Sequence, residues 1–592
     1  MSPDRPDTRL RAPGLMALAS ICGLLALAAG CPGERTPTPS PAPSAADVGL
    51  AVEVDAAPPS EPKGGVKEPA PGSLKIEDVG PAAPTLFFLS GMKGYTEPCG
   101  CTLDVLLGGV DRIAGYLGGA RRLATGALLI DTGDMLFDQP RLESHRVAQE
   151  RAKVDVLIQA HLAMGTASTT PGPNDFALGK HFYLDKVRGA GLEILVANLS
   201  ESEGLPLGVP HVLHEVGGVR LGLIGLVQPD LFLGIEGVAV SDPLEAARKS
   251  LKELKKQGAQ AIVAVYHGDL KATKLLLESV PGIDFAIVGH DPRETDQVDP
   301  VGGGFTLEAY DQGRYIGVLK LLVPKGAAGG PFVNARQASA ADMERVNQRI
   351  EQVDAQIGRL PPATPGAEPP MLLTLREQLA ELKAERVALS NAKLEIPADK
   401  ASFIYRSVAV MPGYPLDAAL TAAREGYNAS LKDLVPDEPI VPVEAGQAEY
   451  VGAERCEGCH PQPTAVWKAS RHSHAIDTLI DRDKSFDGNC IGCHVTGYRQ
   501  PGGSVLGKLQ VTASVGGQAF TKKLENVGCE VCHGPGSLHM IAPVDDAGKA
   551  QNIARAAPEA LCVKCHNEEH STRFNYSVYV EQILGEGHQR KP

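Results

Sequence analysis

The first large part of the chain alternates short apolar runs with amphipathic segments. Each run is nearly free of polar residues, as are strands buried on both faces of a sheet. The runs are Leu86–Leu89, Ala127–Ile130, Ile194–Ala197, Leu221–Leu226, Ala261–Val265 and Phe285–Val288. Helical periodicity occurs between several of them, at Pro243–Gln257 and at Leu270–Ser279. This alternation predicts an α/β domain over residues 84–330, with sheets flanked by helices.

A different period extends over residues 338–395. Apolar residues recur there three or four positions apart, as they do on one face of an α-helix. The two series are Met343, Val346, Ile350, Val353, Ile357 and Leu360, followed by Leu372, Leu375, Leu379, Leu382 and Leu389. Prolines separate the series, which predicts an α-helical hairpin that either packs on a neighbouring domain or mediates oligomer formation. Residues 396–446, with a strand-like run at Ser402–Val410 and a helix around Leu416–Leu434, are expected to be a connecting segment.

The start of the chain has the features of an export signal. A short apolar run at Leu15–Ala29 follows two arginines and ends near Cys31. The run resembles a bacterial lipobox, so residues 1–31 are expected to be a lipoprotein signal peptide and Cys31 the lipidated residue, with ordinary signal cleavage as the alternative. Residues 32–83 are rich in proline and alanine and are expected to form a disordered tether. The resemblance implies a membrane anchor on the periplasmic side of the outer membrane, or at the cell surface.

The strongest chemical pattern lies in residues 447–592, where Cys-x-x-Cys-His occurs four times. At this spacing two thiols attach one haem covalently and the histidine binds its iron. One copy alone is also compatible with a zinc knuckle or a disulfide, but four copies predict four covalently bound c-type haems. The attachment cysteines are Cys456, Cys459, Cys490, Cys493, Cys529, Cys532, Cys562 and Cys565, and the proximal histidines are His460, His494, His533 and His566.

Five further histidines are candidates for the distal axial position of the irons. They are His472, His474, His539, His570 and His588. We expect one of His472 and His474 to be a ligand, followed in preference by His539 and then His588. His570 is the least favoured candidate, because it lies only four residues after His566 of the fourth motif. Two histidine ligands fill both axial positions and favour electron transfer, whereas an iron without a distal ligand could bind a substrate.

The surroundings of these motifs resemble the tetrahaem cytochrome c-554 family. The matching stretches are Tyr450–Cys456, Trp467–Ala475, Cys493–Tyr498 and Asn526–His539. The resemblance implies a mostly α-helical and irregular tetrahaem cytochrome c domain.

The α/β domain resembles the 5′-nucleotidase branch of the calcineurin-like metallophosphoesterase superfamily. The matching stretches are Leu129–Asp134, Gly172–Gly179, Val265–Gly268 and Val280–Pro292. Two metal ions at such positions activate water and clamp a phosphate ester. Of the family's ligand positions Asp134, His267 and His290 remain, whereas Lys93 puts a cation after the first strand. The resemblance therefore implies a vestigial site that holds a single metal ion or none.

Cys99 and Cys101 follow the first predicted strand, in a loop position that handles ligands in α/β sheets. The pair is a redox candidate, because a strained Cys-x-Cys disulfide is readily reduced. A thiolate that carries sulfur, a metal site that borrows His267 or His290, and an inert structural pair are the alternatives. The pair resembles the Cys-Gly-Cys loop of a group of 5′-nucleotidase-like bacterial proteins with an attached multihaem domain.

The net charge of −14 argues against nucleic acid as a partner. We predict a tethered multihaem cytochrome that transfers electrons with other periplasmic redox proteins or with a small-molecule donor or acceptor. Its phosphoesterase-like domain would carry a redox Cys99/Cys101 site or bind a partner. The first alternative is a terminal oxidoreductase acting on a small sulfur or nitrogen species. The second is a metal-dependent 5′-nucleotidase-like phosphoesterase.

Overall fold

A computed structural model of the chain describes residues 69–76, 79–99, 106–324, 330–335, 337–358, 370–390, 396, 399–543, 549, 552–567, 571 and 574–584. The predicted signal peptide, Cys31 and most of the predicted tether lie outside these residues. Within the described ranges, no helix is both long enough and apolar enough to cross a membrane.

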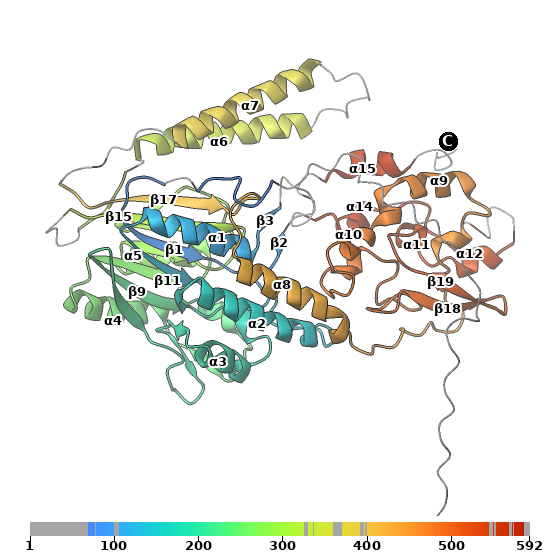
Figure 1. Ribbon diagram of the computed structural model, residues 1–592, viewed down its shortest axis with the longest axis horizontal. Coiled ribbons are helices and arrows are strands. Elements are labelled where there is room, and N and C mark those ends of the chain that lie inside the picture. The colour runs from blue at the N-terminus through green and yellow to red at the C-terminus, as the bar shows by residue number, and fades with distance from the viewer. Residues whose placement is uncertain are drawn as a thin grey trace, which may run out of the picture. The chain divides into compact units, whose positions relative to one another are not determined.

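The α/β region is built on two sheets whose inner faces share one core (Figure 1). The first sheet has the order β16-β17-β15-β1-β4-β5-β6. Its strands are β1 Pro84–Leu89, β4 Gly126–Asp131, β5 Thr166–Thr169, β6 Glu193–Ile194, β15 Tyr315–Leu322, β16 Val333–Asn334 and β17 Ser402–Ala409. Strand β1 is parallel to β4 and antiparallel to β15. Successive side chains of β1 point to opposite faces of the sheet. Leu86 packs between the two sheets, and Phe87 packs against the helices that cover the outer face.

The second sheet has the order β13-β14-β12-β11-β9-β8. Its strands are β8 His211–Val216, β9 Val219–Val227, β11 Ala261–His267, β12 Phe285–Val288, β13 Pro300–Val301 and β14 Gly304–Leu307. Strands β9, β11 and β12 are parallel, so their carboxyl ends lie at one edge. Two small strand pairs complete the region, β2 Pro98–Cys99 with β3 Leu107–Gly108, and β7 Leu199–Glu201 with β10 Val238–Val240.

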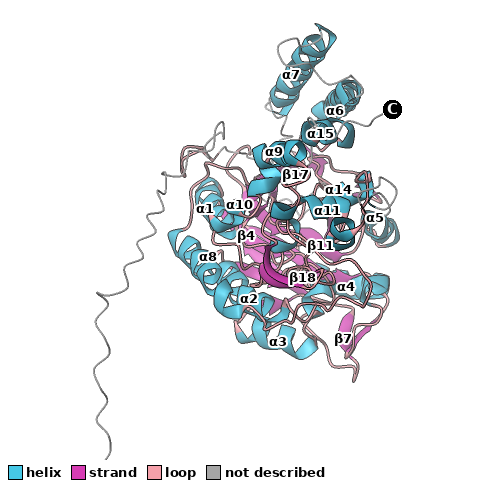
Figure 2. Ribbon diagram, turned by 90° about the vertical axis from the view of Figure 1, so that its right-hand side faces the viewer, coloured by secondary structure: helices cyan, strands magenta, loops and turns pink. Residues whose placement is uncertain are grey.

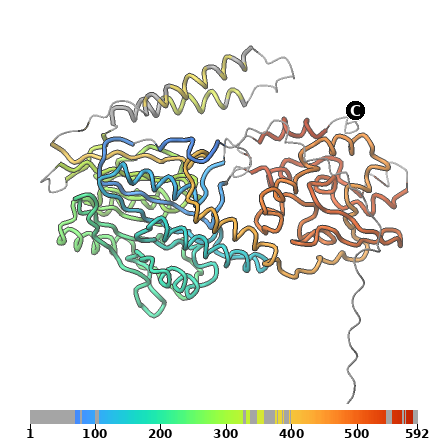
Figure 3. Tube along the Cα trace, viewed as in Figure 1, coloured from blue at the N-terminus to red at the C-terminus, as the bar shows by residue number. Residues whose placement is uncertain are grey.

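Helices cover the outer face of each sheet, as Figure 2 shows in cyan around the magenta strands. Residues of α1 Val110–Ala120, α2 Val147–Ala163 and α8 Ala418–Ser430 pack on the first sheet. Residues of α4 Pro243–Lys256 and α5 Leu270–Ser279 pack on the second, and α3 Lys180–Gly189 packs against the loops near β6. Helices α2 and α8 lie side by side although they are far apart in sequence (Figure 3). The predicted α/β class, with helices on both outer faces, is confirmed.

The sheet extends beyond the predicted boundary at residue 330. Strand β17 and helix α8 come from residues 396–446, the predicted connecting segment. Phe403 and Tyr405 are buried in the core between the sheets, two positions apart as a strand requires. Residues 402–409 are therefore part of the α/β fold, since they pair with β15 along their whole length.

Residues 338–395 contain the two expected helices, α6 Gln337–Gly358 and α7 Pro370–Ser390. They pack against each other through one apolar cluster. Its buried members are Val346, Ile350, Val353, Leu375 and Leu382. The apolar stripe of each helix is thus covered by the other helix.

The carboxyl-terminal region is made of short helices and irregular segments. The helices are α9 Pro461–Ala469, α10 Asp477–Ile480, α11 Cys529–His533, α12 Ser537–Ile541, α14 Glu559–Cys562 and α15 Tyr576–Ile583. A hairpin of β18 Gln510–Val515 and β19 Gln518–Lys523 interrupts them, which the sequence analysis did not predict. The buried Glu530 carboxylate accepts hydrogen bonds from the backbone N–H groups of Val451, Gly452 and Gly536. One side chain thereby joins the segments that flank the first and third haem motifs.

Candidate functional site

The four haem motifs lie close together in pairs. The Cys529 thiol is within hydrogen-bonding reach of Cys456, which places the third motif beside the first. The Cys565 thiol is likewise within reach of Cys493, which places the fourth motif beside the second. Haems attached at neighbouring motifs would be close to one another, as a multihaem electron-transfer chain requires.

Three of the four predicted proximal histidines are oriented by a hydrogen bond at Nδ1. His494 Nδ1 lies 2.5 Å from Ala475 O, and His533 Nδ1 lies 2.7 Å from Ala554 O. His566 Nδ1 lies 3.1 Å from Ser571 Oγ. A partner at Nδ1 fixes the ring and leaves Nε2 to the iron, which is how metal-ligating histidines are commonly held.

Two of the predicted proximal histidines lie close to a second imidazole. The ring centroids of His460 and His539 are 6.0 Å apart, and those of His472 and His566 are 6.2 Å apart. Metal–imidazole bonds are about 2 Å long, so one metal ion bound by two facing rings holds their centroids roughly 6 Å apart. The spacing of both pairs fits an iron with two histidine ligands.

The protonation of these rings also suits iron binding. Burial lowers the pKa of His460, His472 and His566, so the neutral form that binds a metal is favoured. His539 is held by a contact of 3.0 Å between Nδ1 and Lys549 O. The described residues therefore fit haem iron at two of the four motifs in their present positions.

The other distal candidates are placed differently. The side chain of His474 is 66% exposed and its Nδ1 lies 3.3 Å from the Asp477 carboxylate. Of His472 and His474, His472 is the one whose ring lies close to that of His566. His570 and His588 lie outside the described residues.

The remaining phosphoesterase-type residues form a second cluster, which we call the acid–imidazole cluster: Asp134, His267 and His290. Asp134 follows β4, His267 ends β11 and His290 follows β12, so the carboxyl ends of parallel strands bring them together. Their ligand atoms lie within 4.8 Å of one another. His267 Nε2 and His290 Nδ1 are buried atoms without a hydrogen-bond partner among the described residues, 3.5 Å and 3.9 Å from Asp134 Oδ2.

Contacts around the cluster hold it in place. His267 Nδ1 lies 2.8 Å from Thr132 O, and Asp134 Oδ1 accepts a hydrogen bond of 2.8 Å from the backbone N–H of Asn174. Burial alone would raise the pKa of Asp134, but His267 and this N–H hold it below its usual value. A Cβ at Gly172 would lie 2.2 Å from Asp134 Oδ1, so only glycine fits there. The Asn174 side chain donates to Asp138 O at 3.2 Å and does not complete the ligand set.

Cys101 lies outside the described residues, and only the backbone of Cys99 is described, paired with Leu107 between β2 and β3. Glu97, two residues earlier, contacts two other segments. It binds the Arg424 guanidinium at 2.5 Å and lies 3.6 Å from Lys484 Nζ. The segment that leads to Cys99 is therefore linked by charge to the haem-motif region.

A set of buried contacts joins α2 to the segment before the second haem motif. Gln149 Nε2 donates to Phe486 O at 2.6 Å, and Gly488 N donates to Gln149 Oε1 at 2.9 Å. Asn489 Nδ2 donates to Glu150 Oε1 at 2.7 Å. Glu150 is fully buried and also binds Arg146 at 3.0 Å and Lys153 at 2.8 Å. We call this set of interactions the α2 contact. Its residues belong to no recognisable sequence motif.

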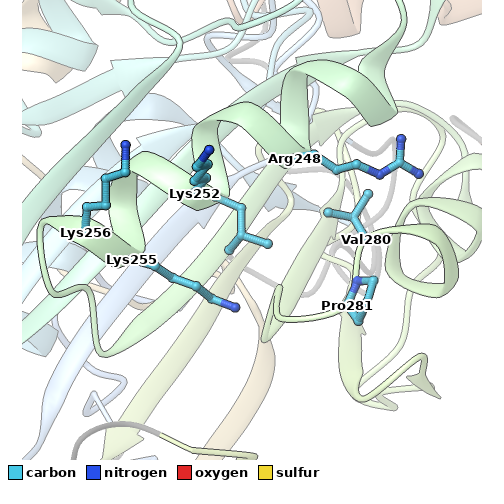
Figure 4. A pocket seen from close by; sticks show the side chains of 7 residues that line it. Arg248, Lys252, Lys255, Lys256, Val280 and Pro281 are labelled. Atoms are coloured by element: carbon cyan, nitrogen blue, oxygen red, sulfur yellow. The ribbon is translucent and has the colours of Figure 1, made fainter.

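One pocket lies between α4 and the residues that follow α5 (Figure 4). It is lined by Arg248, Leu251, Lys252, Lys255, Lys256, Val280 and Pro281. Figure 4 shows basic side chains spread around Val280 and Pro281. These lining residues include no acid to act beside the lysines, so we assign no chemistry to the pocket.

Comparisons with known proteins agree with a chain of two different parts. Residues 455–534 match the family described as cytochrome c554 and c-prime. Cytochrome c-554 from Nitrosomonas europaea is 31% identical over 107 residues, which cover 16% of this chain and 41% of that protein. The match confirms the cytochrome c resemblance, and that family implies c-type haem.

The α/β region is similar to phosphoesterases. A 2′,3′-cyclic-nucleotide 2′-phosphodiesterase/3′-nucleotidase from Yersinia enterocolitica is 28% identical over 209 residues, 31% of this chain and 32% of that protein. The chain therefore spans about a third of that relative. Among solved structures, a 5′-nucleotidase precursor from Thermus thermophilus aligns with 18% identity and a TM-score of 0.41, over 63% of this chain and 61% of that chain. The chain thus joins a region similar to 5′-nucleotidases and 2′,3′-cyclic phosphodiesterases to a carboxyl-terminal region that matches the cytochrome c554 family.

Proposed function

We propose that the protein is a tetrahaem electron-transfer protein. The observation that carries this proposal is the pair of facing imidazoles, His460 with His539 and His472 with His566. Irons with two histidine ligands have no open position, so they exchange electrons without binding a substrate. His494 and His533 would be the proximal ligands of the other two haems.

We further propose that the protein works outside the cytoplasm on a lipid anchor at Cys31. Its partners would be periplasmic redox proteins or a small-molecule donor or acceptor. The export-signal pattern at residues 1–31 and the haem attachment motifs support this location independently, because such haems are attached outside the cytoplasm.

The α/β region would take part through the Cys99/Cys101 pair or as a partner-binding domain. Support comes from Glu97, whose carboxylate lies 3.6 Å from Lys484 in the haem-motif region. A second candidate function, metal-dependent phosphoesterase activity, is favoured by the 28% identity to the Yersinia enterocolitica phosphodiesterase/nucleotidase.

Haem quantification and redox titration of the purified holoprotein test the first proposal. We expect four haems per chain and a reversible, four-electron reduction, followed by the absorbance of the reduced haems. We also expect no hydrolysis of AMP or of a 2′,3′-cyclic nucleotide above a protein-free blank when Mn²⁺ or Zn²⁺ is added. Fewer than four haems, or irreversible reduction, would contradict the tetrahaem proposal, and hydrolysis that is lost in an Asp134→Asn variant would favour the second candidate.

A further inference from the structure

The residues of the acid–imidazole cluster do not fit the two metal ions that the family resemblance implies. Three ligand side chains remain, and together they offer enough ligands for one ion at most. Asn174, in the segment that would supply further ligands, turns its side chain to Asp138 O. The cluster nevertheless keeps two buried imidazole nitrogens directed at one carboxylate, which is an arrangement that attracts a cation.

Lys93 supplies a cation beside this cluster. It follows β1 at the same edge of the sheets, and its backbone N–H donates to Asp134 O at 2.6 Å. Its ammonium Nζ lies 2.5 Å from Asp311 Oδ2 and 3.6 Å from Asp291 Oδ1. The same charge acts electrostatically on Asp134 and on His290. One ammonium therefore pairs with two acids that follow different strands and lies close enough to act on Asp134.

The backbone around this ammonium has several residues other than glycine in the left-handed region. Among the described residues, seven that are not glycine have positive φ angles. Four of them lie here: Lys93 at 49°, Asp134 at 51°, Asp291 at 47° and Gln312 at 59°. Left-handed backbone costs energy for such residues and is concentrated at sites where a precise arrangement is needed. Four positive φ angles thus coincide with the place where the Lys93 ammonium meets the acids.

We propose that Lys93 is a built-in replacement for a metal ion. Its ammonium pairs with Asp311 and Asp291, acts electrostatically on Asp134, and so keeps a divalent cation out of the acid–imidazole cluster. Removing that charge should open a site for one divalent ion, held by Asp134, His267 and His290. Two imidazoles and one carboxylate suit Zn²⁺ or Fe²⁺.

Metal binding to the holoprotein tests this proposal, with Zn²⁺ as the probe. In Lys93→Met the side chain keeps its bulk and loses its charge. We expect the variant to bind one additional equivalent of Zn²⁺ by isothermal titration calorimetry and by metal analysis after gel filtration. The gain in affinity over the wild type should be on the order of 100-fold, the upper end of what an outer-shell group changes. Lys93→Arg keeps the positive charge and is expected to behave as the wild type does.

The double variant Lys93→Met with Asp134→Asn tests whether the additional zinc ion is bound at this cluster and not elsewhere. It should lose the additional equivalent of Zn²⁺ that Lys93→Met gains. Two results would overturn the proposal: a wild type that already binds this equivalent as tightly, or a folded Lys93→Met variant that gains no binding. Folding is checked in the same samples by haem content and by the reversible reduction of the haems. Both should be unchanged, so the outcome at Lys93 is independent of the proposed electron transfer.

Discussion

Replacing His539 by alanine is expected to convert one haem of the four from low spin to high spin. His539 faces His460 at 6.0 Å between ring centroids, so its loss leaves the iron at the first motif with one protein ligand. The open position should bind carbon monoxide in the reduced protein, one equivalent per chain. Electron paramagnetic resonance of the oxidised protein should show a new high-spin ferric signal in place of one low-spin signal.

His474→Ala is the matched control for this experiment. His474 is also a histidine of the haem-motif region, but its side chain is 66% exposed. The control should leave both the spin states and carbon monoxide binding unchanged. His472→Ala should repeat the effect of His539→Ala at the fourth motif, because His472 faces His566. Unchanged spectra in both the His539 and His472 variants would mean that the facing imidazoles do not bind iron.

Replacing Glu150 by alanine is expected to lower the free energy of unfolding by about 3–5 kcal/mol, the usual cost of removing one partner from a buried ion pair. The substitution leaves Arg146 and Lys153 without their shared carboxylate and removes the acceptor of Asn489. Chemical denaturation, followed by far-ultraviolet circular dichroism and by haem absorbance, measures the effect. Glu425→Ala is the control, since this glutamate of α8 has a side chain that is 67% exposed. Equal stability of the two variants would show that the α2 contact adds little.

The same contact should weaken in acid. Burial alone would raise the pKa of Glu150, but Lys153, Asn489 and Arg146 outweigh burial and lower it. Asp487 behaves in the same way, with Lys484 as its main partner. A carboxylate with a lowered folded-state pKa stabilises the fold above its ordinary pKa, and this stabilisation is lost as pH falls through the lowered value. The difference in stability between the wild type and Glu150→Ala should therefore shrink below about pH 4.

Sequence patterns predicted those parts of the fold whose cause is local. Continuous apolar runs identified the central strands because both faces of each are buried, and helical spacing identified α6 and α7. The β18–β19 hairpin was missed because its residues are mostly exposed or half-buried and carry no apolar run. The place of Ser402–Ala409 in the first sheet was not predicted either. An apolar run in the sequence indicates a strand, but it does not indicate which sheet the strand joins.

The candidate sites divide in the same way. The Cys-x-x-Cys-His motif can be recognised in the sequence because the residues that attach one haem are close together along the chain. The choice between His472 and His474 depends on which ring faces His566, which is a tertiary property. The contacts of Lys93 with Asp311, and of Gln149 with Gly488, join residues hundreds of positions apart and leave no pattern along the chain.

The α6–α7 hairpin has a consequence for how this chain could be rebuilt. It is inserted between β16 and β17, and Val333 of β16 is paired directly with Ser402 of β17. Paired residues of neighbouring strands are only about 5 Å apart, so the chain leaves the sheet and returns to it at almost the same point. The apolar stripes of α6 and α7 are buried against each other, so the hairpin has a small apolar core of its own. Because β16 and β17 are parallel, any replacement must still cross back to the start of β17. A glycine-rich linker of about a dozen residues could do this, and a foreign domain could take the same place while the strand order of the sheet stays intact.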